Sequence, residues 1–155
     1  MTLCRRAIVF SLIGFCLAAW ASAQETPYGV GKWDEALGNH RARIQVDQAA
    51  PAVLASIPWR RCDLEVEKKD VLVIDGKSGT PVANRVVAAI SRERGDIVFQ
   101  AAAPGEYFVY YMPCNPGRSA FPTARYNPPK ETAAGEWLAA NRLRKEDLAR
   151  GDWSL

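Results

Sequence analysis

The chain has 155 residues, of which 48% are hydrophobic and 24% charged, and its formal net charge is +3. This composition predicts one folded domain with a tail and excludes a disordered chain and a multi-span membrane protein. Without residues 1–23, 18 Lys and Arg face 17 Asp and Glu. A strongly basic nucleic-acid-binding protein is therefore excluded as well.

Residues 1–23 are predicted to be a cleaved export signal. Two arginines precede an apolar run over residues 7–20, and Ala21 and Ala23 supply the small side chains that a signal peptidase selects. We expect cleavage before Gln24, a periplasmic or extracellular location, and no membrane attachment afterwards. The alternative is an uncleaved anchor, for which the apolar run is short.

Residues 24–113 are predicted to form an antiparallel β-sandwich of the immunoglobulin or jelly-roll kind. Short β-rich runs recur with Gly, Pro and Asp between them, and no long helical period separates them, which excludes a parallel α/β sheet. Pro58 has no N–H to donate, so the second run lies at a sheet edge or ends there. The predicted strands cover residues 40–47, 53–59, 71–74, 82–91, 97–99 and 107–112.

Residues 114–130 are predicted to be a proline-rich connector, and residues 131–155 a short helical tail. The prolines favour a semi-rigid segment. In the tail, Thr132 is placed to cap a helix that ends at Asn141, and residues 144–150 favour a second helix.

The tail carries two large apolar side chains, Trp137 and Trp153. A segment of this length cannot build a core of its own. We therefore expect the two tryptophans to pack on the sandwich, or on a partner chain or catalytic domain.

Two cysteines, Cys62 and Cys114, remain after the predicted cleavage, because Cys4 and Cys16 leave with the signal. An even pair in an exported chain is compatible with one disulfide, and two free thiols are the alternative. A disulfide across this loop would contribute about 4 kcal/mol in the chain-entropy model. With a single histidine, His40, no metal-ligand spacing is present, and no cofactor is expected.

Catalytic signals are weak. The sequence has no nucleophile elbow, phosphate-binding glycine loop or zinc-protease motif, and His40 is interpreted as a strand-edge residue. Asp63, Glu65 and Glu67 alternate, so a strand there would place all three carboxylates on one face, and a glycosidase requires two across the sugar. The flanking Lys and Arg favour a solvated, charge-balanced surface instead, and no catalytic residue is predicted.

The most distinctive string contains Trp59, Arg60 and Arg61, which are the candidate ligand-binding residues. A tryptophan can stack on a sugar ring, and arginine can bind hydroxyl or carboxylate groups. The alternative is a tryptophan in the core with two arginines that face water or the next domain.

Several strings together resemble a known family. The chain is similar to the N-terminal β-sandwich domain of bacterial exported proteins related to glycoside hydrolase family 123, over about residues 28–130. The strings are Gly38-Asn39-His40-Arg41, Ile57-Pro58-Trp59-Arg60-Arg61 with Asp63, Lys68-Lys69, Val71–Asp75, Gly95–Gln100 and Pro104–Tyr111.

The resemblance implies a sandwich that precedes a larger catalytic barrel. In that barrel a neighbouring acidic pair works together with the N-acetyl group of the substrate. No residue of this chain matches the acidic pair, and the sequence ends at Leu155 before a barrel begins. The expectation is therefore a shortened relative, a truncated reading frame or a stand-alone accessory module.

These observations favour a non-catalytic exported domain associated with carbohydrate processing. One alternative is a structural or interaction module that packs on a partner chain or catalytic domain without binding sugar. A further alternative, an active glycosidase, would use Asp63, Glu65 or Glu67.

Overall fold

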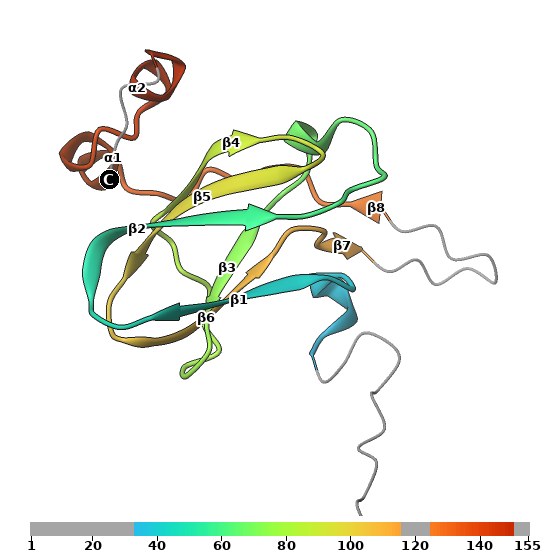
Figure 1. The fold of residues 1–155 in the computed structure, drawn as a ribbon, viewed down its shortest axis with the longest axis horizontal. Helices are drawn as coiled ribbons and strands as arrows, with labels where there is room; N and C mark the ends of the chain where they lie inside the picture. Colours follow the sequence, from blue (N-terminus) through green and yellow to red (C-terminus); the bar gives the residue numbers. More distant parts are fainter. Residues whose placement is uncertain (1–32, 116–124, 151–155) are drawn as a thin grey trace, which may run out of the picture.

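Two three-stranded antiparallel sheets packed face to face form the body of the protein (Figure 1). The computed structural model describes residues 33–115 and 125–150. Its elements are η1 (Glu35–Leu37), β1 (Arg41–Val46), β2 (Ala50–Pro58), η2 (Val66–Lys68), β3 (Leu72–Asp75), β4 (Arg85–Ile90), β5 (Arg94–Ala101), β6 (Gly105–Tyr110), β7 (Cys114–Asn115), β8 (Arg125–Tyr126), α1 (Gly135–Ala140) and α2 (Lys145–Arg150). The predicted mainly β, antiparallel fold with a short helical tail is confirmed.

The strand orders are β1-β6-β3 in the first sheet and β2-β5-β4 in the second, and β7 pairs with β8 in a small third sheet. All neighbouring pairs are antiparallel. β2 is an edge strand, as Pro58 at its end predicted. Within the two described segments, no helix is long and apolar enough to cross a bilayer.

The core lies between the two sheets. Strand alternation turns Tyr107 and Val109 of β6 toward Ile97 and Phe99 of β5, and all four are at most 2% exposed. The rings of Phe99 and Tyr107 lie 5.1 Å apart between centroids. Each such side chain contributes about 1.5–3 kcal/mol through burial, so this layer holds the sheets together.

The tail covers the outer face of the second sheet. Trp137 of α1 and Leu143, which follows it, are buried against Val98 of β5, and Nε1 of Trp137 donates a hydrogen bond to the carbonyl of Pro51 at 2.7 Å. Trp137 thus packs on the sandwich of its own chain. Trp153 lies outside the described residues, as does the predicted signal over residues 1–23.

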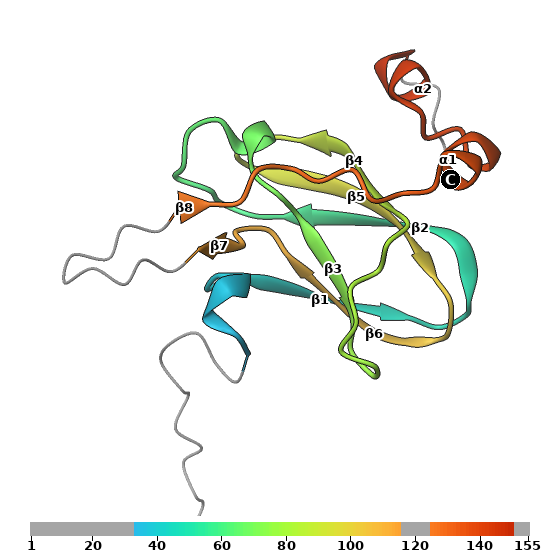
Figure 2. The ribbon, with the colours of Figure 1, turned by 180° about the vertical axis from the view of Figure 1, so that it is seen from behind.

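The predicted cap of the first tail helix is wrong. α1 is preceded by Ala134, which offers no side-chain cap. The hydroxyl of Thr132 instead donates to the carbonyl of Ala83 and accepts from Nη1 of Arg85, both at 2.7 Å. These tertiary hydrogen bonds tie the tail to the sandwich at the start of β4. Figure 2 shows the chain crossing from β8 to α1 on the side of the molecule that faces the viewer there.

Candidate functional site

The segment that follows β2 continues in an alternating pattern and divides the candidate residues into two groups. Trp59, Arg61 and Asp63 point inward, whereas Arg60, Cys62 and Leu64 are exposed. Two backbone hydrogen bonds of 2.9 Å, from Trp59 to Glu93 and from Arg61 to Arg92, hold the segment against the turn between β4 and β5.

Trp59 is a core residue, 5% exposed. Its Nε1 donates to the carbonyl of Ser91 at 2.9 Å, and its ring lies 4.7 Å from that of Tyr111 between centroids. A Cβ at Gly95 would lie 2.0 Å from the Trp59 ring, so glycine is required for this close approach. The indole faces are thus occupied within the chain, which does not favour a stacking platform for sugar. Sugar binding by this string stays a prediction.

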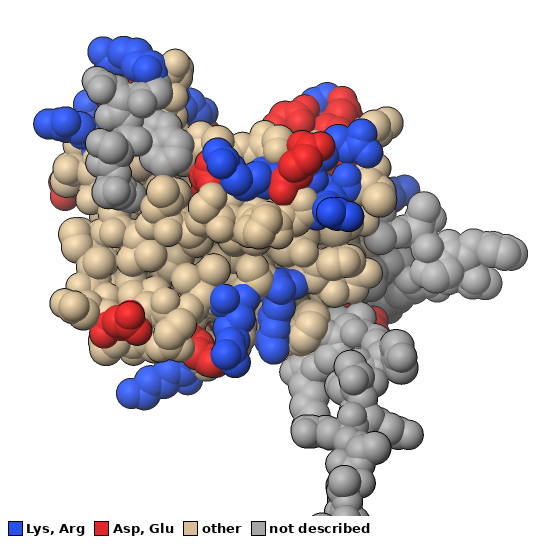
Figure 3. Space-filling view, viewed as in Figure 1, with Lys and Arg blue, Asp and Glu red and all other residues tan. Residues whose placement is uncertain are grey.

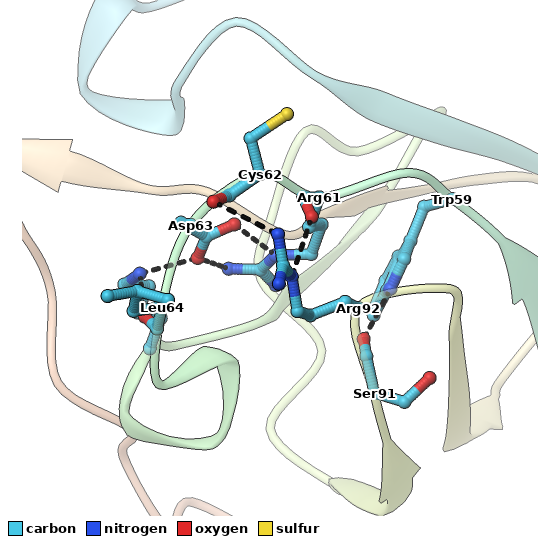
Figure 4. Close-up of polar contacts among 8 residues, drawn as sticks. Trp59, Arg61, Cys62, Asp63, Leu64, Ser91 and Arg92 are labelled. Carbon is cyan, nitrogen blue, oxygen red and sulfur yellow. Dashed lines mark hydrogen bonds and ion pairs between the residues drawn. The ribbon is translucent and has the colours of Figure 1, made fainter.

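Arg61 lies at the centre of the site (Figure 4). Its side chain is 1% exposed, and its Nε and Nη2 donate to the carboxylate of Asp63 at 3.0 and 2.8 Å. The guanidinium carbon lies 5.4 Å from the Trp59 ring and 5.9 Å from the Tyr111 ring. Nη1 is buried without a hydrogen-bond partner among the described residues, and these cation–π contacts offset part of that cost.

Asp63 is the acidic partner of two basic side chains, Arg61 and Lys69. Two hydrogen bonds from Arg61, joined by one from Lys69, hold the pKa of Asp63 well below its ordinary value. Burial raises the pKa of Tyr111, and the positive charge of Arg61 opposes that change. Asp63 therefore stays ionised and serves as the counter-ion of a buried arginine.

Arg92 and Cys62 lie on the solvent side of this site. Arg92 donates to the carbonyls of Arg61 at 3.3 Å and Cys62 at 3.5 Å. The Cys62 side chain points away from the ion pair in Figure 4. Cys62 and Cys114 are both free thiols in this structure, so the disulfide is not formed here and stays a prediction.

The alternating carboxylates do not share a strand face. Glu65 adopts a left-handed backbone conformation, with φ of 55°, and begins the turn of η2. It pairs with Lys68, and this hydrogen bond lowers the pKa of Glu65. The charge-balanced surface that the sequence favoured is present at Glu65, whereas Asp63 is more buried than that interpretation implied.

His40 lies on the surface beside Tyr111. It is exposed, contacts Asn39, and its ring lies 5.9 Å from that of Tyr111 between centroids. Across residues 33–115 and 125–150, no three His, Cys, Asp or Glu side chains are grouped so that they could hold a metal ion.

Sequence reasoning missed Lys69, Tyr111 and Arg92 as members of the site. Tyr111 and Arg92 come from segments remote from Trp59 along the chain, so no local spacing signals them, whereas Lys69 lies six residues after its partner Asp63. The sequence did offer a sign that Trp59, Arg61 and Asp63 point the same way. They are every second residue of one segment, and an extended segment places every second side chain on the same side.

Residues 31–152 match the family of glycoside hydrolase 123, N-terminal domain. No curated protein and no solved structure gives a significant match to the chain. The family match covers most of the chain, including both sheets, the site around Arg61 and the two tail helices. The resemblance found from the sequence is thereby confirmed, and the chain belongs to the glycoside hydrolase 123 N-terminal domain family.

Proposed function

We propose that this chain is a non-catalytic accessory domain of carbohydrate processing, which acts by packing on the catalytic domain of a glycoside hydrolase. The observation that carries the proposal is the bidentate ion pair of Asp63 with the buried Arg61. This ion pair gives the segment from Trp59 to Arg61 a structural role within the domain.

A glycosidase needs a carboxylic acid with a raised pKa as proton donor. The pKa values of Asp63 and Glu65 are instead lowered by hydrogen bonds from neighbouring Arg and Lys side chains. Both groups are therefore poor proton donors near neutral pH. This argument favours an interaction role over the glycosidase alternative.

The surface best suited to docking is the uncharged edge strand β2 and the loop after it. Figure 3 shows charged side chains above and below β2, with an uncharged face between them. Leu54 of β2 is 40% exposed, and Leu64 in the following loop is 74% exposed. The cores of protein interfaces are depleted of charge, and exposed large apolar side chains often mark them. The backbone carbonyl of Leu64 accepts a hydrogen bond from Nζ of Lys69 at 2.6 Å.

The docking proposal is tested with a family 123 catalytic domain from the same organism, expressed as a separate chain. We expect association that is measurable by titration calorimetry. Leu54→Asp and Leu64→Asp should each weaken it by at least about tenfold, because each places a charge in the interface core. The control Thr80→Asp, in the turn after β3, should leave the affinity unchanged. Absence of association, or equal effects of all three variants, would contradict the proposal.

The glycosidase alternative is tested with a chromogenic N-acetylgalactosaminide. We expect turnover by the isolated chain to equal that of buffer. Turnover that is lost in Glu65→Gln would overturn the non-catalytic assignment. Because this assay uses no partner, its result is independent of the docking experiment.

A further inference from the structure

A cavity of about 260 Å³ lies at the edge of the sandwich, where η2, the start of β3 and strand β4 meet the tail. Strand β5 separates it from β2, and the inference drawn from it does not depend on the docking proposal. Its walls are mainly apolar. They include Val86 and Ile90 of β4 and Leu138, Leu143 and Leu148 of the tail.

One wall carries a buried ion pair, Arg85 with Asp70, and both side chains are 6% exposed. Nε of Arg85 donates to the carbonyl of Val71 at 2.8 Å. Nη1 of Arg85 donates to the hydroxyl of Thr132 at 2.7 Å and to the carbonyl of Val82 at 3.3 Å. Two of the three nitrogens of the guanidinium group are thus committed to the protein.

The third nitrogen of Arg85, Nη2, lies 3.5 Å from Oδ1 of Asp70 and makes no hydrogen bond to the described part of the chain. Oδ1 of Asp70 accepts from the backbone N–H of Val71 at 3.0 Å and of Lys130 at 3.4 Å. Oδ2 of Asp70 accepts none from a described residue. Arg85 and Asp70 are therefore ion-paired, but Nη2 and Oδ2 make no hydrogen bond to a described residue and stay an uncommitted donor and an uncommitted acceptor for a ligand.

The charge around the cavity is balanced. At its rim Lys145 pairs with Glu131, and the two side chains are largely exposed. Glu67, Lys69 and Lys130 also line the cavity, so four basic side chains face three acidic ones. The ammonium of Lys69 is paired with Asp63, which lies outside the lining, and the remaining charges balance. A charged ligand would find no excess of the opposite charge in the cavity. The lining therefore favours a neutral ligand.

The size of the cavity sets the size of the ligand. A cavity of about 150 Å³ accommodates benzene, so 260 Å³ corresponds to a ligand of about ten non-hydrogen atoms. A sugar ring of similar size carries several hydroxyl groups, each of which requires a polar partner. The mainly apolar walls do not provide them, so they favour a ligand with an apolar body.

We propose that this cavity is a binding site for a neutral carboxamide on an apolar body, with the amide oxygen accepting from Nη2 of Arg85 and the amide N–H donating to Oδ2 of Asp70. An amide presents an acceptor and a donor side by side, which matches the two uncommitted groups. A carboxylate would repel Asp70, and an ester would leave Asp70 without a donor.

Phenylacetamide is the test ligand, because it has an aromatic body and a primary amide and about the required size. Binding to the full chain is followed by two-dimensional NMR of the backbone amides. We expect saturable shifts at pocket residues with a Kd of about 1 mM, as ordinary ligand efficiencies give for this size. The isosteric phenylacetate and the neutral ester methyl phenylacetate should each bind at least about fivefold more weakly.

Two variants fill the cavity from different elements. Ala133→Leu and Leu148→Phe should each abolish the shifts, because both residues line the cavity. The control Ala140→Leu repeats the first substitution at an exposed position of α1 and should leave binding unchanged. Using two filling variants keeps the test valid when one of them fails to fold.

Two outcomes overturn the assignment. One is the absence of saturable shifts at the pocket, or shifts that persist in both filling variants. The other is binding of phenylacetate or the ester that equals that of the amide. A second titration, with N-acetylphenylalaninamide, distinguishes two sources of the ligand. This compound should bind with at least equal affinity when the site takes a peptide. It should fail to bind when the site takes only a small free amide.

Discussion

Arg61 shows how one buried charge determines the structure around it. Its guanidinium is almost fully buried, and Asp63, Lys69 and two aromatic rings surround it. A buried arginine is costly unless it is paired, and removing one partner of such a pair is more damaging than the pair is stabilising. The short run from Trp59 to Asp63 therefore depends on Asp63 staying ionised.

Asp63→Asn should lower the free energy of unfolding by about 3 kcal/mol at pH 7, because it leaves Arg61 buried without a counter-ion. The pKa of Asp63 is lowered in the folded state, so the stabilisation by this group is complete above its ordinary pKa of about 4 and is lost as the pH falls below that value. The difference between wild type and variant, measured by urea unfolding at several pH values, should shrink below about pH 4.

The exposed pair of Glu65 and Lys68 supplies the control. Glu65→Gln removes a carboxylate of the same loop, but solvent screens that charge, so no measurable change in unfolding is expected. Equal effects of the two substitutions would show that the buried ion pair does not organise the loop.

Gly95→Ala should destabilise the protein by about 2 kcal/mol through overpacking. The added Cβ would lie 2.0 Å from the Trp59 ring, which Ser91 and Tyr111 hold in place. The same substitution at Gly135, where nothing lies within 4 Å, should leave stability unchanged or raise it by up to about 1 kcal/mol. Thermal unfolding of both variants measures the contrast, and a neutral Gly95→Ala would show that Trp59 can move aside.

At the scale of elements, the tail is a second layer on the second sheet. α1 and α2 have six residues each and are too short to be stable in isolation. Their helical structure therefore depends on docking through Trp137, Leu143 and the hydrogen bonds of Thr132. The cavity proposed as a ligand site lies at this junction and requires a docked tail.

Trp137→Ala should release the tail while the sandwich stays folded. The substitution removes the largest apolar side chain of the docked layer and its hydrogen bond to Pro51, a loss of about 3–5 kcal/mol where the layer cannot rearrange. Limited proteolysis should then cut within residues 131–150 much faster than in the wild type. Trp137→Phe keeps an aromatic ring and should give an intermediate rate, and equal resistance of all three proteins would contradict this account.

At the scale of the whole molecule, the exported state is a prediction that depends on residues outside the described part of the chain. We expect the protein recovered from the periplasm or medium to begin at Gln24, because the small residues before Gln24 fit a signal peptidase. Intact mass spectrometry measures this. A mass that includes residues 1–23 would favour the uncleaved anchor.

Much of the architecture could be predicted from the sequence. The apolar alternation of residues 41–46, the turn residues after Asp75 and the proline at the end of β2 each act locally, and β1, the β3–β4 turn and the edge position of β2 follow from them. The second tail helix also begins and ends close to its predicted limits. The cap at Thr132 could not be predicted, because a tertiary contact with Arg85 competes for its hydroxyl.

The sequence by itself determined the sandwich class, the edge strand and the family, because strand alternation, turn chemistry and motif strings are properties of neighbouring residues. Only the tertiary structure decided that Trp59 is enclosed, that Arg61 is buried with Asp63, and that Arg85 and Asp70 face a cavity. These outcomes depend on which distant side chains meet when the sheets and the tail close together. Burial and pairing of a charge are set by that closure, and no local pattern in the chain encodes it.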